Sequence, residues 1–359
     1  MSDSFIKINT LSVSKNLADF VKNELLTGLD INEKDFWDGF DKSINELAPI
    51  NKKLLEVRET LQSEIDLWLK KNRNGEFNHQ EYKNFLKEIG YLKEEGNDFK
   101  IDTKKLDSEI SSIAGPQLVV PIMNSRYTLN AANARWVSLY DSLYGTDIIE
   151  SEETGSQKYD PLRGQEVIRY AREFLNDHFS INEIHWKDIN GFKIKGSDLK
   201  ILKDDKEFEL VDKNKFIGYR GEPNNPTTII LENNNLKIEI IINPKAFSAV
   251  QDAAGISDII IESAISTICD NEDSVAAVDS EDKILCYRNW LGLMKGTLKS
   301  VFEKDGKTLE RKLNPDRSYI SKDNKKEKLH GRSLLLIRNV GHLMTLSLIH
   351  ISEPTRQDS

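Results

Sequence analysis

Residues 115–145 read GPQLVVPIMNSRYTLNAANARWVSLYDSLYG, a short apolar run that ends in polar and basic residues. The run, Leu118–Met123, predicts a buried strand, and Asn124, Ser125 and Arg126 follow it directly. Parallel α/β sheets and barrels place functional side chains at the carboxyl ends of their strands. The stretch therefore predicts one strand of such a sheet followed by a helix over 131–144, although a solvated loop position for Arg126 fits equally well.

Two later stretches repeat this pattern. Residues 268–282 read ICDNEDSVAAVDSED, in which carboxylates surround the small apolar run Val275–Val278. Residues 333–339 read SLLLIRN, an apolar run with Arg338 at its carboxyl end. Acids at both ends of a short buried strand suggest a site for a hard cation or for proton chemistry. The carboxylates are Asp270, Glu272, Asp273, Asp279, Glu281 and Asp282.

Arg338 needs an anionic partner, because a buried guanidinium cannot lose its charge by deprotonation. The partner is one of the acids near 270–282, an anionic substrate, or both, and a purely structural ion pair is the simpler alternative. Asp270 and Glu272 are the best candidates for a cleft, because alternate residues of a strand face the same side. Glu281 and Asp282 are expected to be solvated, since Mg²⁺ takes only one or two protein carboxylates.

The remaining sequence divides into two kinds of segment. Residues 15–100 show apolar spacings of three to four, which predict an α-helical module; Pro49 is expected to end one helix and Gly90 to cap the last. Residues 147–262 predict an α/β unit with a helix over 161–175 and a hairpin around Asn233–Asn235. Further predictions are a helix-like stretch over 259–282, a helix over 287–298 and a β-rich insert over 302–319.

Composition limits the function classes. The 359 residues carry a formal net charge of −9, which argues against nucleic acid as a partner. Neither a long apolar run nor a secretory leader is found, so a cytoplasmic protein without a membrane partner is expected. Cys269 and Cys286 form no CxxC pattern and are interpreted as small buried apolar residues.

The final segment, 346–359, reads LSLIHISEPTRQDS. It resembles the translation of a DNA-sequencing adapter. We therefore expect it to be an artefact of gene assembly, exclude it from the fold and give His350 no role. Three buried strands with intervening helices suggest part of a parallel barrel, and three strands cannot close an eight-stranded one. The natural reading frame is therefore expected to continue past Thr345.

Three blocks, residues 115–136, 266–296 and 329–345, resemble malate synthase in its long G form. The resemblance runs from about Leu17 to Thr345, and the helical module and the 147–262 unit favour the G form over the short form. It implies an α/β fold, a TIM (β/α)8 barrel that is incomplete here, with an N-terminal α-helical clasp and an inserted α/β domain. The implied boundaries are 1–110 for the clasp, 115–145, 263–298 and 333–345 for the barrel, and 146–262 and 299–332 for the insert.

The resemblance also implies an activity: Mg²⁺-dependent condensation of acetyl-coenzyme A with glyoxylate and water to (S)-malate and coenzyme A, in the glyoxylate bypass, by a monomeric enzyme. Arg338 would be the catalytic arginine and would bind glyoxylate. Asp270 and Glu272 would lie near the Mg²⁺ without ligating it directly. The residues that match the acetyl-coenzyme A site are Val119, Arg126, Tyr127, Ser274 and Arg311.

The family's catalytic base and direct metal ligands lie on segments that this sequence lacks. The 359-residue chain is therefore expected to be inactive and poorly folded by itself, since an unclosed barrel exposes strand edges. One alternative is a non-catalytic fragment that binds coenzyme A, against which the adapter-like tail argues. Another is a related barrel acyl-coenzyme A lyase, which would lack the clasp and the large insert.

Overall fold

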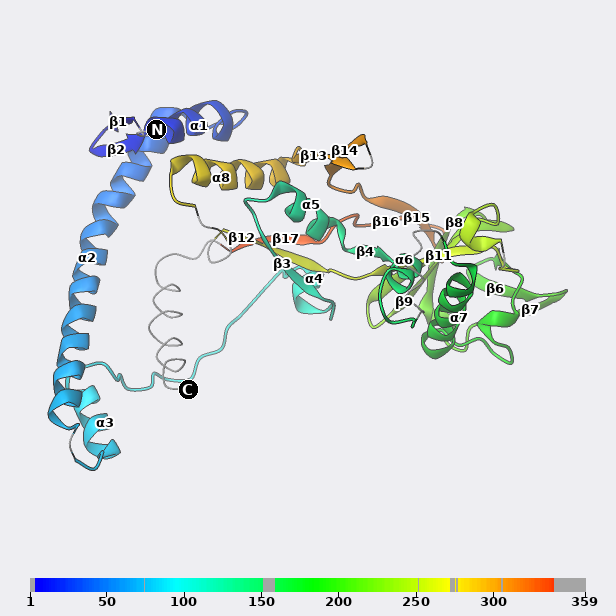
Figure 1. The fold of residues 1–359 in the computed structure, drawn as a ribbon, viewed down its shortest axis with the longest axis horizontal. Helices are drawn as coiled ribbons and strands as arrows, with labels where there is room; N and C mark the ends of the chain where they lie inside the picture. The colour runs from blue at the N-terminus through cyan, green and yellow to red at the C-terminus, as the bar shows by residue number, and fades with distance from the viewer. Residues whose placement is uncertain are drawn as a thin grey trace. The chain divides into compact units, whose positions relative to one another are not determined.

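The computed structural model describes residues 4–73, 75–150, 159–250, 252–271, 275, 277–304 and 306–338. The chain divides into two units (Figure 1). The first comprises residues 1–105 with 279–284, and the second comprises 106–278 with 285–359.

The first unit is mainly helical. Its elements are β1 Phe5–Ile8, β2 Leu11–Ser14, α1 Lys15–Phe20, the π-helical turn Val21–Leu25, α2 Glu33–Lys71 and α3 His79–Glu88. The Asn32 side chain caps α2 by accepting from the Lys34 N–H at 2.8 Å. Trp68 of α2 stacks on Phe85 of α3, with ring centroids 5.6 Å apart. The predicted N-terminal helical module is therefore present, and Gly90 follows α3 with the positive φ of +75° expected of a helix end.

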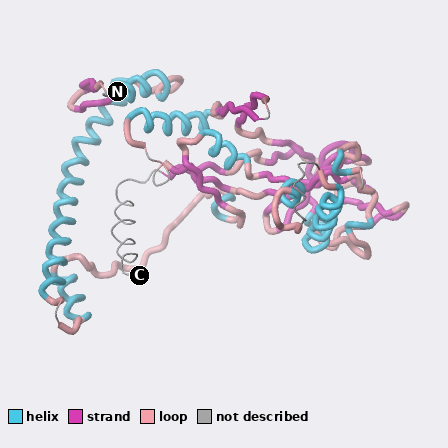
Figure 2. Tube along the Cα trace, in the orientation of Figure 1, coloured by secondary structure: helices cyan, strands magenta, loops and turns pink. Residues whose placement is uncertain are grey.

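The helix break predicted at Pro49 is wrong. Pro49 lies inside α2, which Figure 2 draws as one continuous helix. A proline removes only one intrahelical hydrogen bond, and helix formation is cooperative, so the turns on both sides sustain a helix of 39 residues.

The second unit contains a parallel sheet, a large antiparallel sheet and two smaller antiparallel groups of strands. Its main helices are α4 Ser108–Ser111, α5 Ser125–Asn133, α6 Leu139–Tyr144, α7 Pro161–His178 and α8 Ser280–Lys295, the last of which begins in the first unit. Short 3-10 turns occupy Trp186–Asp188, Lys213–Lys215 and Phe247–Ala249. The strands are β3 Gln117–Pro121, β4 Trp136–Ser138, β5 Gly191–Lys195, β6 Asp198–Lys203, β7 Lys206–Phe208, β8 Phe216–Glu222, β9 Asn225–Asn233, β10 Leu236–Ile242, β11 Ile256–Glu262, β12 Ser266–Asp270, β13 Lys299–Lys304, β14 Lys307–Lys312, β15 Arg317–Ser321, β16 Lys326–Leu329 and β17 Leu334–Arg338.

The parallel sheet has the strand order β17-β12-β3, and the three strands lie side by side in Figure 1. Strands β3 and β17 are the apolar runs predicted from residues 115–145 and 333–339, whereas β12 lies in the stretch over 259–282 that was expected to be helix-like. Asp270 is in register with both Pro121 and Arg338, so the three strands end together at one edge. The described part of the chain shows this three-stranded parallel sheet, and a closed TIM barrel is not shown.

The seven-stranded sheet is antiparallel, in the order β16-β15-β8-β9-β10-β11-β4. Helix α7 packs on it through a shared apolar core that includes Val167 and Leu175 of the helix and Ile229 and Ile240 of the sheet. The predicted α/β unit and its hairpin are confirmed: Asn234 and Asn235 have positive φ values of 52° and 64° between β9 and β10.

Three expectations about local structure are wrong. The predicted helix over 131–144 is split into α5 and α6 by β4, which pairs with β11. The predicted helix-like stretch over 259–282 contains β11 and β12, because a short run rich in isoleucine suits a buried strand as well as a helix. The predicted strand at Val275–Val278 does not form at its described residues: Val278 is 85% exposed, and such small side chains bury little apolar area.

Helices α5 and α8 cover one face of the parallel sheet. Leu129 of α5, Cys269 of β12, and Cys286 and Leu293 of α8 share one apolar core. The helix predicted over 287–298 is thus present but begins earlier, at Ser280. Because β-strand residues alternate between faces, Asp270 and Arg338 lie on the opposite face from Cys269, with Val119 on the same face as they are.

None of the described helices combines the length and apolar character that a bilayer crossing requires.

Candidate functional site

The carboxyl edge of the parallel sheet carries a two-pronged ion pair. Arg338 Nε donates to Asp270 Oδ1 at 2.9 Å, and Arg338 Nη2 donates to Asp270 Oδ2 at 2.8 Å. The Asp270 side chain is 0% exposed, whereas the Arg338 side chain is 28% exposed. This fork geometry fixes the plane of the guanidinium, because both donors must meet both carboxylate oxygens. Of the partners predicted for Arg338, an acid of the 270–282 segment is the one observed.

Backbone hydrogen bonds lock the same edge. The Ile122 N–H donates to the Asp270 carbonyl at 2.8 Å, and the Asn271 N–H donates to the Arg338 carbonyl at 2.9 Å. The ends of β3, β12 and β17 are therefore held at one level, so the segment that follows β3 begins at a fixed distance from Asp270.

The loop from β3 to α5 is held by two polar side chains, of which Asn289 is buried. Asn289 of α8 is 5% exposed and donates from Nδ2 to the carbonyls of Ile122 and Met123, at 2.9 and 3.1 Å. The Asn124 side chain accepts from the Tyr127 N–H at 3.0 Å and caps α5. Asn289 was not found by sequence reasoning, since a single asparagine inside a helix carries no pattern; its partners become visible only once α8 packs against the sheet.

Four of the five residues matched to the acetyl-coenzyme A site lie in described segments. Val119 is 54% exposed and Tyr127 is 57% exposed. Arg126 and Arg311 are also exposed. Ser274, and Glu272 from the predicted metal surroundings, lie outside the described residues.

The structure brings Arg126 and Arg311 to one surface. The Arg126 guanidinium carbon lies 4.0 Å from the centre of the Phe302 ring, on the β13–β14 hairpin. Arg311 pairs with Ser300 across this hairpin, so it shares a face with Phe302. Phe302 was missed by sequence reasoning, because nothing in its local sequence marks it as a neighbour of α5.

The described residues do not make up a metal site by themselves. Among them, no group of three His, Cys, Asp or Glu side chains is arranged to hold a metal ion. Both Asp270 oxygens accept hydrogen bonds from Arg338, which leaves the carboxylate poorly suited to direct ligation.

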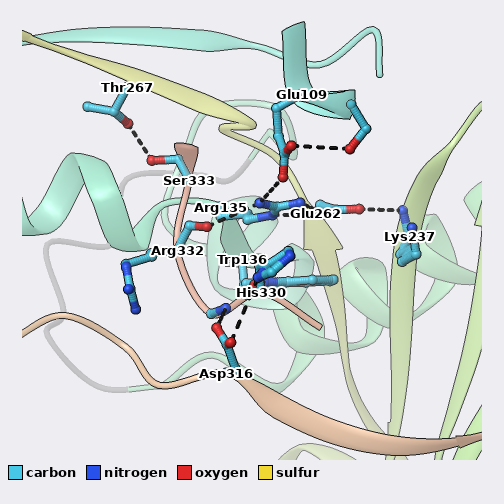
Figure 3. Close-up of polar contacts among 12 residues, drawn as sticks. Glu109, Arg135, Trp136, Lys237, Glu262, Thr267, Asp316, His330, Arg332 and Ser333 are labelled. Atoms are coloured by element: carbon cyan, nitrogen blue, oxygen red, sulfur yellow. Dashed lines mark hydrogen bonds and ion pairs between the residues drawn. The ribbon is translucent and has the colours of Figure 1, made fainter. Parts of the chain in front are cut away.

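A second buried network lies at the opposite end of the parallel sheet (Figure 3). Arg135, 4% exposed, pairs with Glu262 at 2.8 Å and with Glu109 at 3.0 Å. Its Nη1 also donates to the Arg332 carbonyl at 3.2 Å, two residues before β17. Arg135 thus joins α4, β11 and the start of β17, a structural role that sequence reasoning missed.

Local environment shifts two titratable groups near these networks. Burial alone would raise the pKa of Glu109, but hydrogen bonds from its own backbone and from Arg135 bring that pKa below its ordinary value. Burial raises the pKa of the Cys269 thiol to about 12. Cys269 and Cys286 are both buried in the apolar core, in agreement with their interpretation as core residues.

Comparison with known proteins finds similarity to one class of enzyme. The family model described as "Malate synthase, N-terminal domain" matches residues 16–78, and the model described as "Malate synthase G, alpha-beta insertion domain" matches residues 159–233. The helical module and the inserted α/β unit thus each contain a segment that is similar to a domain of malate synthases.

Individual relatives narrow the class to the G form. The chain is 45% identical to malate synthase G of Halalkalibacterium halodurans, over 97% of this chain and 48% of that protein. It is 44% identical to the Corynebacterium efficiens malate synthase G, over 95% of this chain and 46% of that protein. It is 46% identical to malate synthase G of Corynebacterium glutamicum, over 93% of this chain and 45% of that protein. The resemblance to malate synthase G is confirmed, and the chain spans about half the length of the curated relatives it matches.

Proposed function

We propose that this chain supplies the acyl-donor site and the catalytic arginine of a malate synthase. The reaction is the condensation of acetyl-coenzyme A with glyoxylate and water, which gives (S)-malate and coenzyme A. The observation that carries the proposal is the forked pair of Arg338 with buried Asp270 at the carboxyl edge of a parallel sheet. This is the edge at which α/β barrels place their catalytic groups.

Arg338 is proposed to bind glyoxylate and to stabilise the enolate oxygen that forms on the acetyl thioester. Its guanidinium keeps its charge at any pH of interest, and Asp270 holds it in one orientation. One well-placed hydrogen-bond donor to a developing oxyanion lowers the activation free energy of an enzymatic reaction by about 3 kcal/mol. Asp270 acts here as the residue that orients Arg338.

The acyl donor is proposed to lie along Val119, Arg126, Tyr127, Ser274 and Arg311. Arg126 and Arg311 are suited to the phosphates of the nucleotide, because a guanidinium forms paired hydrogen bonds with phosphate oxygens. Val119 offers exposed apolar surface on the face of the sheet that also carries Asp270 and Arg338. Such an apolar surface suits the uncharged part of a thioester substrate.

The proposal extends to the fold, the metal and the oligomeric state of the full-length enzyme. The parallel sheet is proposed to be part of a TIM barrel, with the clasp, barrel and insert divided as the resemblance implies. Mg²⁺ is proposed as the metal that polarises the glyoxylate aldehyde, with Asp270 and Glu272 near it and the direct ligands supplied from outside the described residues. The full-length enzyme is proposed to be a cytoplasmic monomer.

Binding of coenzyme A to this chain tests the acyl-donor site. Isothermal titration calorimetry is expected to show binding that weakens about tenfold in Arg126→Ala and in Arg311→Ala, since each variant loses a charge-assisted contact. Lys245→Ala removes an exposed cation of the insert and is the matched control. Equal affinities in all four proteins would refute the assignment of these arginines.

Release of coenzyme A from acetyl-coenzyme A, measured with and without glyoxylate, separates the two main alternatives. Glyoxylate-dependent release that disappears in Arg338→Lys supports a complete active site within this chain. Binding of coenzyme A without any release supports a binding segment that requires further residues for turnover, which is the outcome that we expect.

A further inference from the structure

The β13–β14 hairpin is fastened to helix α5. The Asn133 side chain, at the end of α5, donates to the Lys312 carbonyl at 2.9 Å and accepts from the Asn314 N–H at 2.8 Å. Asn133 is only 9% exposed, so these two bonds are shielded from water. The hairpin is therefore held at a defined position along α5.

This attachment places an aromatic ring under a basic side chain. Phe302 of β13 is half-buried, and the guanidinium of Arg126 lies over its face at 4.0 Å from the ring centre. Arg311 of β14 extends from the same face of the hairpin. One short hairpin thus contributes both the platform for Arg126 and the second arginine of the surface.

The contact changes what Arg126 can do. An exposed arginine carries about 2 kcal/mol of rotamer entropy, which binding of a phosphate would have to overcome. A ring face that attracts the guanidinium restricts those rotamers before the ligand arrives, which is how preorganisation improves affinity. The edge of the guanidinium, with its N–H donors, still points outward when its flat face rests on a ring.

We propose that Phe302 is a positioning residue that preorganises Arg126 for the phosphate groups of the acyl donor's nucleotide. The inference rests on the proposed function, in which Arg126 and Arg311 bind that nucleotide. Phe302 acts on the nucleotide end of the ligand alone, and it touches Arg126 rather than the reacting atoms.

Two ligands distinguish this role from a general structural one. S-acetylpantetheine shares the thioester arm of acetyl-coenzyme A and lacks its nucleotide. Phe302→Leu is expected to weaken binding of acetyl-coenzyme A by about three- to fivefold, the factor that corresponds to a cation–π contact at an exposed site. Binding of S-acetylpantetheine should be unchanged, and Phe302→Tyr should restore the affinity for acetyl-coenzyme A.

A matched control is the neighbouring Val301→Ala. Val301 is 63% exposed and lies on the opposite face of the same strand. The Val301→Ala variant should therefore bind acetyl-coenzyme A as tightly as the unmodified chain does. A loss of affinity for both ligands in Phe302→Leu would indicate unfolding of the hairpin and overturn the positioning role. Undiminished binding of acetyl-coenzyme A in Phe302→Leu would do the same.

The failure of the proposed function has a different signature. If the unmodified chain and Arg126→Ala bind acetyl-coenzyme A equally weakly, the nucleotide site itself is refuted. The contact can be tested without ligand by NMR: the side-chain protons of Arg126 should show an upfield ring-current shift that Phe302→Leu abolishes and Phe302→Tyr retains. Absence of that shift in the unmodified chain would also overturn the inference.

Discussion

Arg338 and Asp270 lie opposite each other in neighbouring parallel strands, and the guanidinium meets both carboxylate oxygens. Asp270 is fully buried, whereas Arg338 is partly exposed, so the carboxylate is the fixed partner and the guanidinium is the partner that solvent can reach. The local cost of burying one carboxylate is thereby offset by its ion pair, and the arginine gains a defined orientation.

The first prediction concerns this pair. Asp270→Asn keeps the shape of the side chain and removes its charge, so it is expected to lower the free energy of unfolding by about 3 kcal/mol. Urea denaturation monitored by circular dichroism would measure the change. Glu310→Gln, which breaks the exposed pair with Lys299, is the control and should cost about 0.5 kcal/mol or less. Equal effects of the two substitutions would contradict the assigned role of Asp270.

The second prediction concerns Arg135. Arg135→Met leaves the carboxylates of Glu262 and Glu109 without their main cation, and should cost about 3 to 5 kcal/mol. In the unmodified chain the pKa of Glu109 lies below its ordinary value of 4.5, so its contribution to stability is present above that pH and is lost as the pH falls through the folded value. Denaturation curves between pH 6 and 3 should therefore show a weaker acid dependence in Arg135→Met. If both proteins showed the same pH dependence of stability, the ion pair of Glu109 with Arg135 would not be its cause.

The third prediction concerns Glu209, a partly exposed carboxylate of the insert. Hydrogen bonds from Lys200 and Lys213 lower the pKa of Glu209 to about 2. Its stabilising contribution is therefore expected above the ordinary value of 4.5 and should vanish as the pH approaches 2. Carbon-13 NMR of the side-chain carboxyl group measures this pKa directly, and Lys200→Met should raise it. No change in Lys200→Met would contradict the assignment of Lys200 as the largest cause.

The fourth prediction concerns the two cysteines. Cys269 is fully buried with a pKa raised to about 12, so almost none of it is thiolate at neutral pH. Cys286 is 1% exposed in the same core. Ellman's reagent is expected to react with neither thiol in the folded chain and with both after addition of denaturant. Rapid reaction of either thiol under native conditions would show that this core opens.

The fifth prediction concerns Asn289. Asn289→Leu removes the donor to two carbonyls that lie directly before α5, and should destabilise the second unit by about 1 to 3 kcal/mol. Met294→Ala, on the same helix and 61% exposed, should change stability by about 0.5 kcal/mol or less. The comparison isolates the two hydrogen bonds from a general effect of altering α8.

Sequence patterns predicted the parts of this fold that depend on local periodicity. The apolar run before Arg338 and the polar residues after β3 were enough to predict strands that end in functional side chains, and register then placed Asp270 beside Arg338. The resemblance to malate synthase G supplied the ligands and the roles, which the patterns did not contain.

Features that depend on tertiary packing could not be predicted in this way. Asn289, Arg135 and Phe302 gain their roles from partners far away in the sequence, and no local spacing marks them. The stretch over 259–282 was misassigned because an apolar run of that length suits either a strand or a helix. Pairing of β11 with β10 and β4, and of β12 with β3 and β17, decides between them.

The connectivity of the parallel sheet has a consequence for the order of folding. Gln117 of β3 bonds to Ser266 of β12 across 149 residues of sequence, and Asp270 reaches Arg338 across a further 68. Closing loops of this length is entropically costly unless the intervening residues have already become compact. The insert, whose hairpins pair near neighbours, should therefore fold first and draw the strands on either side of it together. The carboxyl edge of the parallel sheet would then assemble late, in refolding as well as during synthesis, because β3 leaves the ribosome before β12 and β17 have been made.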